Sequence, residues 1–212
     1  HAVSWLTRRP GGFTDRGIQV LERINGPLAR LAETCALRRV AKNLLDTYVG
    51  DRSGANILAG RIRRGDTEEI DAVVWLSDLR GFTAMADTLS GEKLIETLNT
   101  HFDCLIPAVV ENGGEVLKFM GDGMLAIFPT DGPEDAGIAE NNALKAALVA
   151  RQNMKALNIE RRYDSLEELC FGVALDIGRV HYGNIGAANR LDFTAIGPAV
   201  NLAARMETIA AE

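Results

Sequence analysis

The chain has few of the residues that build disulfide-bonded, zinc-binding or membrane-spanning proteins. Its three cysteines, at positions 35, 104 and 170, include no CxxC pair and no Cys/His ligand spacing. Neither a disulfide framework nor a zinc site is expected, and a reducing cytoplasm is the predicted location. No apolar run reaches the roughly 18 residues of a spanning helix, and the start lacks a signal-peptide pattern. The chain as given is predicted to be soluble, without membrane contact.

Charge also excludes a class of partner. The 29 acidic and 23 basic residues give a net charge of −6, which predicts no broad attraction to nucleic acid. Any phosphate binding must be local. At 212 residues and 47% hydrophobic content, the chain is long and apolar enough for one globular domain plus an extension.

The first 65 residues predict an extension rather than a domain. Residues 2–6 are typical of a short strand and residues 9–12 of a turn, which suggests the end of an upstream domain over residues 1–14. Residues 15–65 form a predicted helical coupling or dimerisation segment, because apolar residues recur at helical spacing from Ile18 and shift register after Cys35. Two interpretations stay open: a helix packed on its own domain, or a parallel dimeric coil that relays a signal.

From residue 66 onward, strand and helix patterns alternate. A buried strand over 70–77 is followed by a helix between 91 and 112 and by a hairpin of strands 115–120 and 124–128. A long helix from Asp131 to about Leu157 precedes strands 169–177 and 179–185. This order predicts a ferredoxin-like α+β fold.

Two aspartates end strands in this pattern. Asp78 follows the 70–77 strand and precedes a glycine-containing turn that enters a helix, whose free N–H groups can hold phosphate oxygens. Asp122 lies at the hairpin tip. Each has a simple structural explanation, since Asp is common at helix N-caps and in hairpin turns. Together they predict a two-metal site, because carboxylates are suitable ligands for Mg²⁺.

Three runs of residues carry a resemblance to class III adenylate and guanylate cyclases. They are Leu76–Thr83 (LSDLRGFT), Gly114–Gly123 (GEVLKFMGDG) and Asp192–Arg205 (DFTAIGPAVNLAAR). The resemblance implies a cyclase catalytic domain over residues 66–212. A weaker likeness of the first 14 residues is to the closing strand of a GAF-type sensory domain.

The resemblance assigns roles to ten residues. Asp78 and Asp122, with the Leu79 carbonyl, match the ligands of two Mg²⁺ or Mn²⁺ ions, and Gly81, Phe82 and Thr83 match the phosphate-binding turn. Lys118 and Thr194 match the pair that reads the purine and imply adenine. Asn201 matches the residue that orients the ribose, and Arg205 matches the arginine that stabilises charge on the α-phosphate.

The implied function is an adenylate cyclase, which converts ATP to 3′,5′-cyclic AMP and pyrophosphate at a homodimer interface. No protein nucleophile is required, and the isolated His101 and His181 fit surface or core positions. The alternatives are a guanylate cyclase and a non-catalytic cyclase-like dimerisation module. A diguanylate cyclase is not supported, because the GG[DE]EF signature is missing. The chain ends shortly after the arginine helix, so the resemblance implies that further C-terminal strands are missing.

Overall fold

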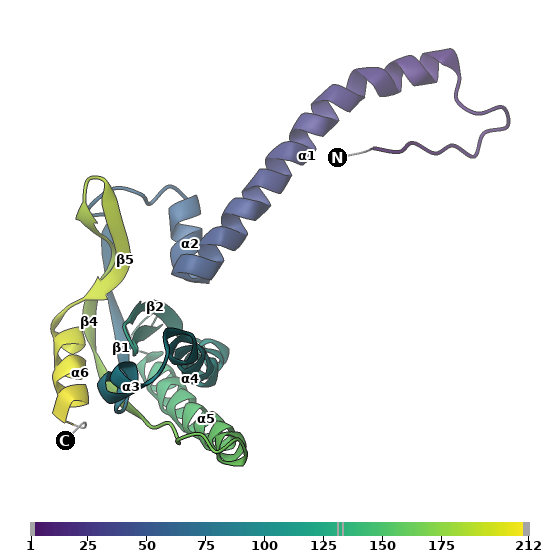
Figure 1. The fold of residues 1–212 in the computed structure, drawn as a ribbon. Helices are drawn as coiled ribbons and strands as arrows, with labels where there is room; N and C mark the ends of the chain where they lie inside the picture. Colours follow the sequence, from purple (N-terminus) through teal and green to yellow (C-terminus); the bar gives the residue numbers. More distant parts are fainter. Residues whose placement is uncertain (1–2, 131, 133, 210–212) are drawn as a thin grey trace.

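The computed structural model describes residues 3–130, 132 and 134–209. Figure 1 shows a long helix that extends away from a sheet flanked by helices. In chain order the elements are α1 (Asp15–Val49), α2 (Asp51–Leu58), β1 (Thr67–Leu79), α3 (Phe82–Thr88), α4 (Gly91–Glu111), β2 (Glu115–Met120), β3 (Gly123–Pro129), α5 (Ala136–Tyr163), β4 (Phe171–Ala187), β5 (Arg190–Ile196) and α6 (Pro198–Ile209).

The sheet has the strand order β2-β3-β1-β4-β5, with every neighbouring pair antiparallel. The predicted buried strand is therefore central. Its β-branched and aromatic residues favour extended backbone, and alternate side chains enter opposite cores. Val73 and Trp75 pack with α4 and α5, whereas Ala72, Val74 and Leu76 pack with residues of α6. The α+β prediction is confirmed, with helices on both faces of one antiparallel sheet.

Most predicted elements of the catalytic part are confirmed. The hairpin of β2 and β3 forms as expected, and α4 begins after Ser90, whose hydroxyl accepts a hydrogen bond from the Lys93 N–H. The long helix α5 continues to Tyr163 instead of ending near Leu157. Its predicted start at Asp131 lies outside the described residues.

Two strand predictions are wrong. The two strands expected over 169–177 and 179–185 are one strand, β4, because Gly178 pairs with Ala72 of β1 and the ladder continues through it. At the N-terminus, Val3–Leu6 forms no strand, because it lies beside α1, away from both edges of the sheet (Figure 1), and Ala2 lies outside the described residues. The turn at residues 9–12 does form, with the Gly12 N–H 3.1 Å from the Arg9 carbonyl oxygen.

Among the described residues, helix α1 meets the catalytic part at its C-terminal end, through α2 and β2. None of its 35 residues is buried, so it does not pack on its own domain along its length. A buried carboxylate connects the next helix to the sheet: Glu115 of β2 accepts hydrogen bonds from the Ser53 N–H and hydroxyl of α2 and from the Tyr182 hydroxyl of β4. Among the described residues, no helix combines the length and apolarity needed to cross a bilayer.

Candidate active site

The two predicted metal-binding aspartates lie together at one end of the central strand. Ser77 of β1 pairs with Met124 of β3, so Asp78 lies beside the hairpin tip that carries Asp122. Both carboxylates are partly buried, and they lie close enough for the Asp78 side chain to raise the pKa of Asp122. Two acidic groups in contact need a proton or a cation between them.

The proton affinity of Asp122 reflects this placement. Burial is the main reason that its pKa is raised from the usual 3.8 to about 6, and the hydrogen bond and charge of Asp78 act in the same direction. The N–H groups of Asp122 and Leu79 oppose the rise. A divalent cation would remove the repulsion between the carboxylates, so the donor set fits such an ion.

No third acidic, histidine or cysteine side chain joins them within the described part of the chain. Gly123 keeps the approach close, because a Cβ there would lie 3.2 Å from Asp78 Oδ1 and 3.1 Å from the Ser77 carbonyl oxygen. The remaining ligands would have to come from main-chain oxygens, such as the predicted Leu79 carbonyl, from water or from substrate.

The predicted phosphate-binding turn follows Asp78 directly. Gly81 has φ of +75°, a conformation that glycine adopts without strain, and it precedes α3. Phe82 and Thr83 are the first two residues of α3, so their N–H groups have no acceptor within the helix. The turn therefore offers hydrogen-bond donors next to the carboxylates.

The predicted base-reading residues lie elsewhere. Lys118 is on the edge strand β2, and its Nζ is 3.0 Å from Oδ2 of Asp192 on the opposite edge strand, β5. Thr194 is buried two residues further along β5, and its hydroxyl has no hydrogen-bond partner among the described residues. No hydrogen bond joins Lys118 to Thr194 in that part of the chain. A buried hydroxyl without a partner is costly, which is consistent with a ligand as its missing partner.

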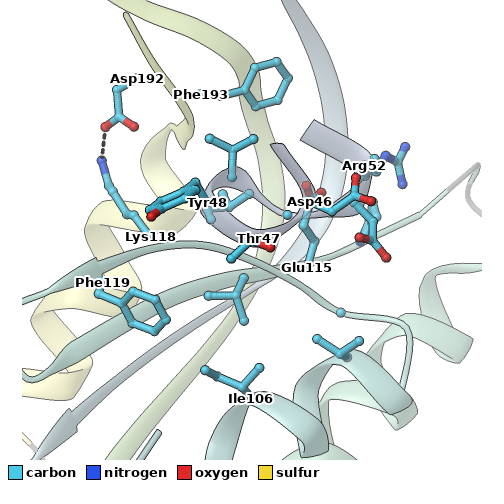
Figure 2. Close-up of a pocket in the computed structure, with 18 of the residues that line it drawn as sticks. Asp46, Thr47, Tyr48, Arg52, Ile106, Glu115, Lys118, Phe119, Asp192 and Phe193 are labelled. Carbon is cyan, nitrogen blue, oxygen red and sulfur yellow. Dashed lines mark hydrogen bonds and ion pairs between the residues drawn. The ribbon is translucent and has the colours of Figure 1, made fainter. Parts of the chain in front are cut away.

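Lys118 lies at a cavity that does not include the two predicted metal-binding aspartates. Figure 2 shows its side chain directed at Asp192 across this cavity, which has a volume of about 640 Å³. The lining comes from the end of α1 and from α2, α4, β2 and β5, and includes Tyr48 and Glu115. Asp78 and Asp122 are not among the lining residues. Within one chain, the predicted base-reading and metal-binding groups are therefore separate.

Asn201 and Arg205 lie on α6, on the other face of the sheet from α4 and α5. Both side chains are exposed, and they are one helical turn apart. Ala199 and Ala203 hold the helix against the sheet. No hydrogen bond or ion pair joins Asn201 or Arg205 to Asp78 or Asp122 across the described residues. The structure therefore brings the aspartates together with the phosphate turn, whereas the half-buried Lys118, the buried Thr194 and the exposed Asn201 and Arg205 lie apart from them.

Sequence reasoning missed three charged partners of this region. Asp192 pairs with Lys118, and Arg80, between the aspartate and the glycine of the turn, forms an ion pair with Glu207 of α6. All three lie inside or just beyond the quoted runs. A charged residue next to a predicted site residue was the only signal that the sequence offered.

Comparison with known proteins identifies the family. Residues 66–212 match the family model described as "Adenylate and Guanylate cyclase catalytic domain". One relative is the terminal-differentiation specific adenylate cyclase of Dictyostelium discoideum, 34% identical over 70% of this chain and 7% of the relative. Another is an adenylate cyclase of Anabaena cylindrica, 34% identical over 61% of this chain and 25% of the relative. The chain spans a quarter or less of these relatives.

Solved structures agree on the fold. The adenylyl cyclase CyaB from P. aeruginosa matches with a TM-score of 0.63 and 30% identity, over 68% of this chain and 74% of that one. The guanylyl cyclase Cya2 matches with a TM-score of 0.61 and 27% identity, over 68% and 72%. Because the family model covers more than half of the sequence, this chain belongs to the family of adenylate and guanylate cyclase catalytic domains.

Proposed function

We propose that the chain converts ATP to 3′,5′-cyclic AMP and pyrophosphate, with two Mg²⁺ or Mn²⁺ ions, in active sites shared by the two chains of a head-to-tail homodimer. The observation that carries the proposal is the contact of the Asp78 and Asp122 carboxylates beside the Gly81 turn. A binding module would have no use for two adjacent, partly buried acids, one of which, Asp122, has a raised pKa. Next to a phosphate-binding turn, they suit metal–nucleotide chemistry.

In the proposed reaction, the ribose 3′-oxygen forms a bond to the α-phosphorus, the bond from that phosphorus to the pyrophosphate oxygen breaks, and the hydroxyl proton passes to solvent water. Asp78, Asp122 and the Leu79 carbonyl would hold the two ions, whose charge would acidify the hydroxyl and neutralise the triphosphate. The N–H groups of Phe82 and Thr83 would donate to phosphate oxygens. Asn201 would orient the ribose, and Arg205 would stabilise the charge that grows on the α-phosphate.

The proposed base is adenine. Lys118 and Thr194 supply a cation and a hydroxyl, and the unpartnered Thr194 hydroxyl supports a role in hydrogen bonding to a ligand. Both named relatives are adenylate cyclases, but one solved neighbour is a guanylyl cyclase. The choice of base therefore rests on Lys118 and Thr194.

The homodimer is proposed because one chain separates the two groups of residues. The metal-binding aspartates of one chain would face Lys118, Asn201 and Arg205 of the other, which gives two complete sites per symmetric dimer. The exposed α1 would extend this contact as a coupling segment. Its apolar side chains recur along the helix without burial, as expected of one strand of a coiled coil: Ile18, Ile24, Leu28, Leu31, Leu37 and Leu44.

The direct test is an assay of cyclic nucleotide formation from ATP and from GTP with Mn²⁺. Cyclic AMP should form in excess, and Asp78→Ala and Asp122→Ala should each abolish it while the far-ultraviolet circular dichroism spectrum stays unchanged. Excess cyclic GMP would support the guanylate cyclase alternative. No product with either nucleotide, from a folded dimer supplied with Mn²⁺, would support the non-catalytic alternative.

Subunit complementation tests the shared site. Asp78→Ala and Arg205→Ala chains should each be inactive alone, because each homodimer has a lesion in both sites. In a mixed dimer, both lesions fall in one site and the other is intact. Random exchange should restore about a quarter of wild-type activity, by the symmetry of the dimer. If subunit exchange is demonstrated and the mixture stays inactive, the shared-site arrangement is wrong.

A further inference from the structure

Arg80 connects the metal-binding turn to the helix that carries Asn201 and Arg205. Its Nη1 atom is 2.8 Å from Oε1 of Glu207 on α6, and both side chains are largely buried, with 24% and 10% of their surface exposed. The contact is a charge pair rather than an aligned hydrogen bond, because Oε1 has no aligned donor among the described residues. A buried carboxylate without a cation would be strongly unfavourable, so Glu207 depends on Arg80.

The route of the Arg80 side chain requires a glycine. Gly172 of β4 pairs with Asp78 of β1, and a Cβ at Gly172 would lie 1.8 Å from Nη2 of Arg80. The guanidinium therefore crosses β4 in contact with its backbone. The Arg80 N–H also donates to the Cys170 carbonyl, at 2.8 Å, which fixes its main chain. Arg80 is therefore fixed at its main chain, which belongs to the metal-binding turn, and at its guanidinium, which lies against α6.

The Arg80–Glu207 ion pair joins parts of two different active sites, if the proposed shared-site dimer is correct. In that dimer, the turn of a chain serves one active site and its α6 serves the other. We propose that Arg80 and Glu207 are positioning residues whose ion pair sets the metal-binding turn and α6 relative to each other, and so couples the two active sites. Neither residue is proposed to contact the nucleotide.

The experiment uses a mixed dimer with a single intact site. One chain carries Arg205→Ala and supplies the working turn; its partner carries Asp78→Ala and supplies the working α6. Glu207→Gln is then added to the first chain, whose own α6 lies in the inactive site. In a separate mixture, Arg80→Gln is added to the second chain, whose own turn lies in the inactive site. Each new lesion can affect the working site only through the ion pair.

The proposal requires both additions to lower turnover, by about 2- to 30-fold, the range typical of coupling through a packed network. Glu207→Gln should also raise the Mn²⁺ concentration for half-maximal activity, because it loosens the turn that carries Asp78. Arg80→Gln should lower kcat without that shift. Loss of folded dimer alone would reduce activity without moving the Mn²⁺ dependence, so turnover is expressed per folded mixed dimer, and Arg80→Gln must lower it on that basis.

Two further variants make the test independent of folding. Gly172→Ala on the first chain keeps every charge but displaces the flexible end of Arg80, and should resemble Glu207→Gln. Glu168→Gln removes the more exposed Arg162–Glu168 ion pair, whose atoms are 3.0 Å apart, and should change nothing. If either crosswise addition matches this control, the coupling proposal is overturned. An inactive starting dimer, with subunit exchange demonstrated, would instead refute the shared site itself, and the coupling with it.

Discussion

Lys118 and Asp192 lie on strands at opposite edges of the sheet, yet Nζ of Lys118 is 3.0 Å from Oδ2 of Asp192. The sheet is therefore curved so that its two edge strands approach each other at this point. The pair is exposed, with 32% and 57% of the side-chain surfaces accessible, so Asp192 orients the ammonium more than it stabilises the fold. A purine that binds Lys118 would meet a side chain already held in one direction.

This geometry predicts unequal effects of two substitutions. Lys118→Ala should lower kcat/KM for ATP about tenfold or more, because it removes a base contact worth roughly 1–3 kcal/mol. Asp192→Asn should cost less than about fivefold, since exposed ion pairs contribute under about 1 kcal/mol. Steady-state kinetics with ATP and GTP would measure both. An Asp192→Asn effect as large as that of Lys118→Ala would mean that Asp192 contacts the nucleotide directly.

The contact between Asp78 and Asp122 should lower the free energy of unfolding at a pH where both carboxylates are charged. A raised folded-state pKa means that the wild-type chain becomes less stable as pH rises from 3.8 through about 6, because the folded form must release a proton that it binds more tightly. Asp122→Asn removes this charge and can donate to Asp78. We expect it to raise the free energy of unfolding at pH 8 by up to about 1 kcal/mol while abolishing activity.

Urea unfolding in EDTA measures that gain, which should shrink at pH 4.5, where the wild-type carboxyl is protonated. Addition of Mn²⁺ should reverse the order of the two proteins, because only the wild type keeps both ligands. An Asp122→Asn protein that is less stable than the wild type at pH 8 would contradict a repulsive contact.

His101 predicts a pH dependence of the opposite sign. The residue is fully buried on α4 beside Phe102 and Phe171, and neither ring nitrogen has a hydrogen-bond partner among the described residues. Burial lowers its pKa from 6.5 to about 4, against the opposing charge of Asp78. The unfolded chain therefore binds a proton that the folded chain rejects, and the free energy of unfolding should fall as pH drops from 6.5 to 4.

The contribution of His101 is isolated by comparing wild type with His101→Phe at pH 7.5 and pH 4.5. The wild type should lose about 1–3 kcal/mol more than the variant over this interval. His181, which is exposed on β4, supplies the control: His181→Asn should leave the pH dependence of the wild type unchanged. Equal losses in wild type and His101→Phe would show that His101 does not stay neutral in the fold.

The parts of the fold that the sequence could predict are those set by local patterns. Apolar residues around Trp75 predict a buried strand, and the Gly121–Gly123 turn predicts a hairpin. The expected break at Gly178 was wrong because pairing with β1 supports the backbone there, and such pairing is not visible in β4 alone. For the segment that forms β5, the sequence predicts a motif rather than a strand.

The sequence could likewise predict only part of the candidate site. Asp78 and Asp122 could be predicted to meet, since each ends a strand of the same sheet. The Lys118–Asp192 pair could not, because 74 residues separate its members and the two edge strands meet only in the folded sheet. The Arg80–Glu207 pair depends on the absence of a side chain at Gly172, a steric condition that appears only once β4 is placed beside β1.

Glu115 gives the last prediction, because it joins the helical segment to the catalytic sheet. Its buried carboxylate accepts hydrogen bonds of 2.8 Å from the Ser53 N–H and 2.8 Å from the Tyr182 hydroxyl, so three elements depend on one side chain. Burial raises the pKa of Tyr182, which therefore stays a donor. Glu115→Ala should lower the free energy of unfolding by about 2–4 kcal/mol, because it leaves buried donors unpaired, whereas Tyr182→Phe should cost about 1–2 kcal/mol.

The Glu115→Ala variant should also open locally, at the junction between α2 and the sheet. Hydrogen exchange should accelerate in α2 and at the start of β2 for Glu115→Ala, and much less in α4 and α5, which belong to the other core. Since Lys118 is three residues from Glu115 on the same strand, KM for ATP should rise as β2 loosens. Uniform acceleration across all helices would show that Glu115 supports the whole fold rather than the junction between α2 and the sheet.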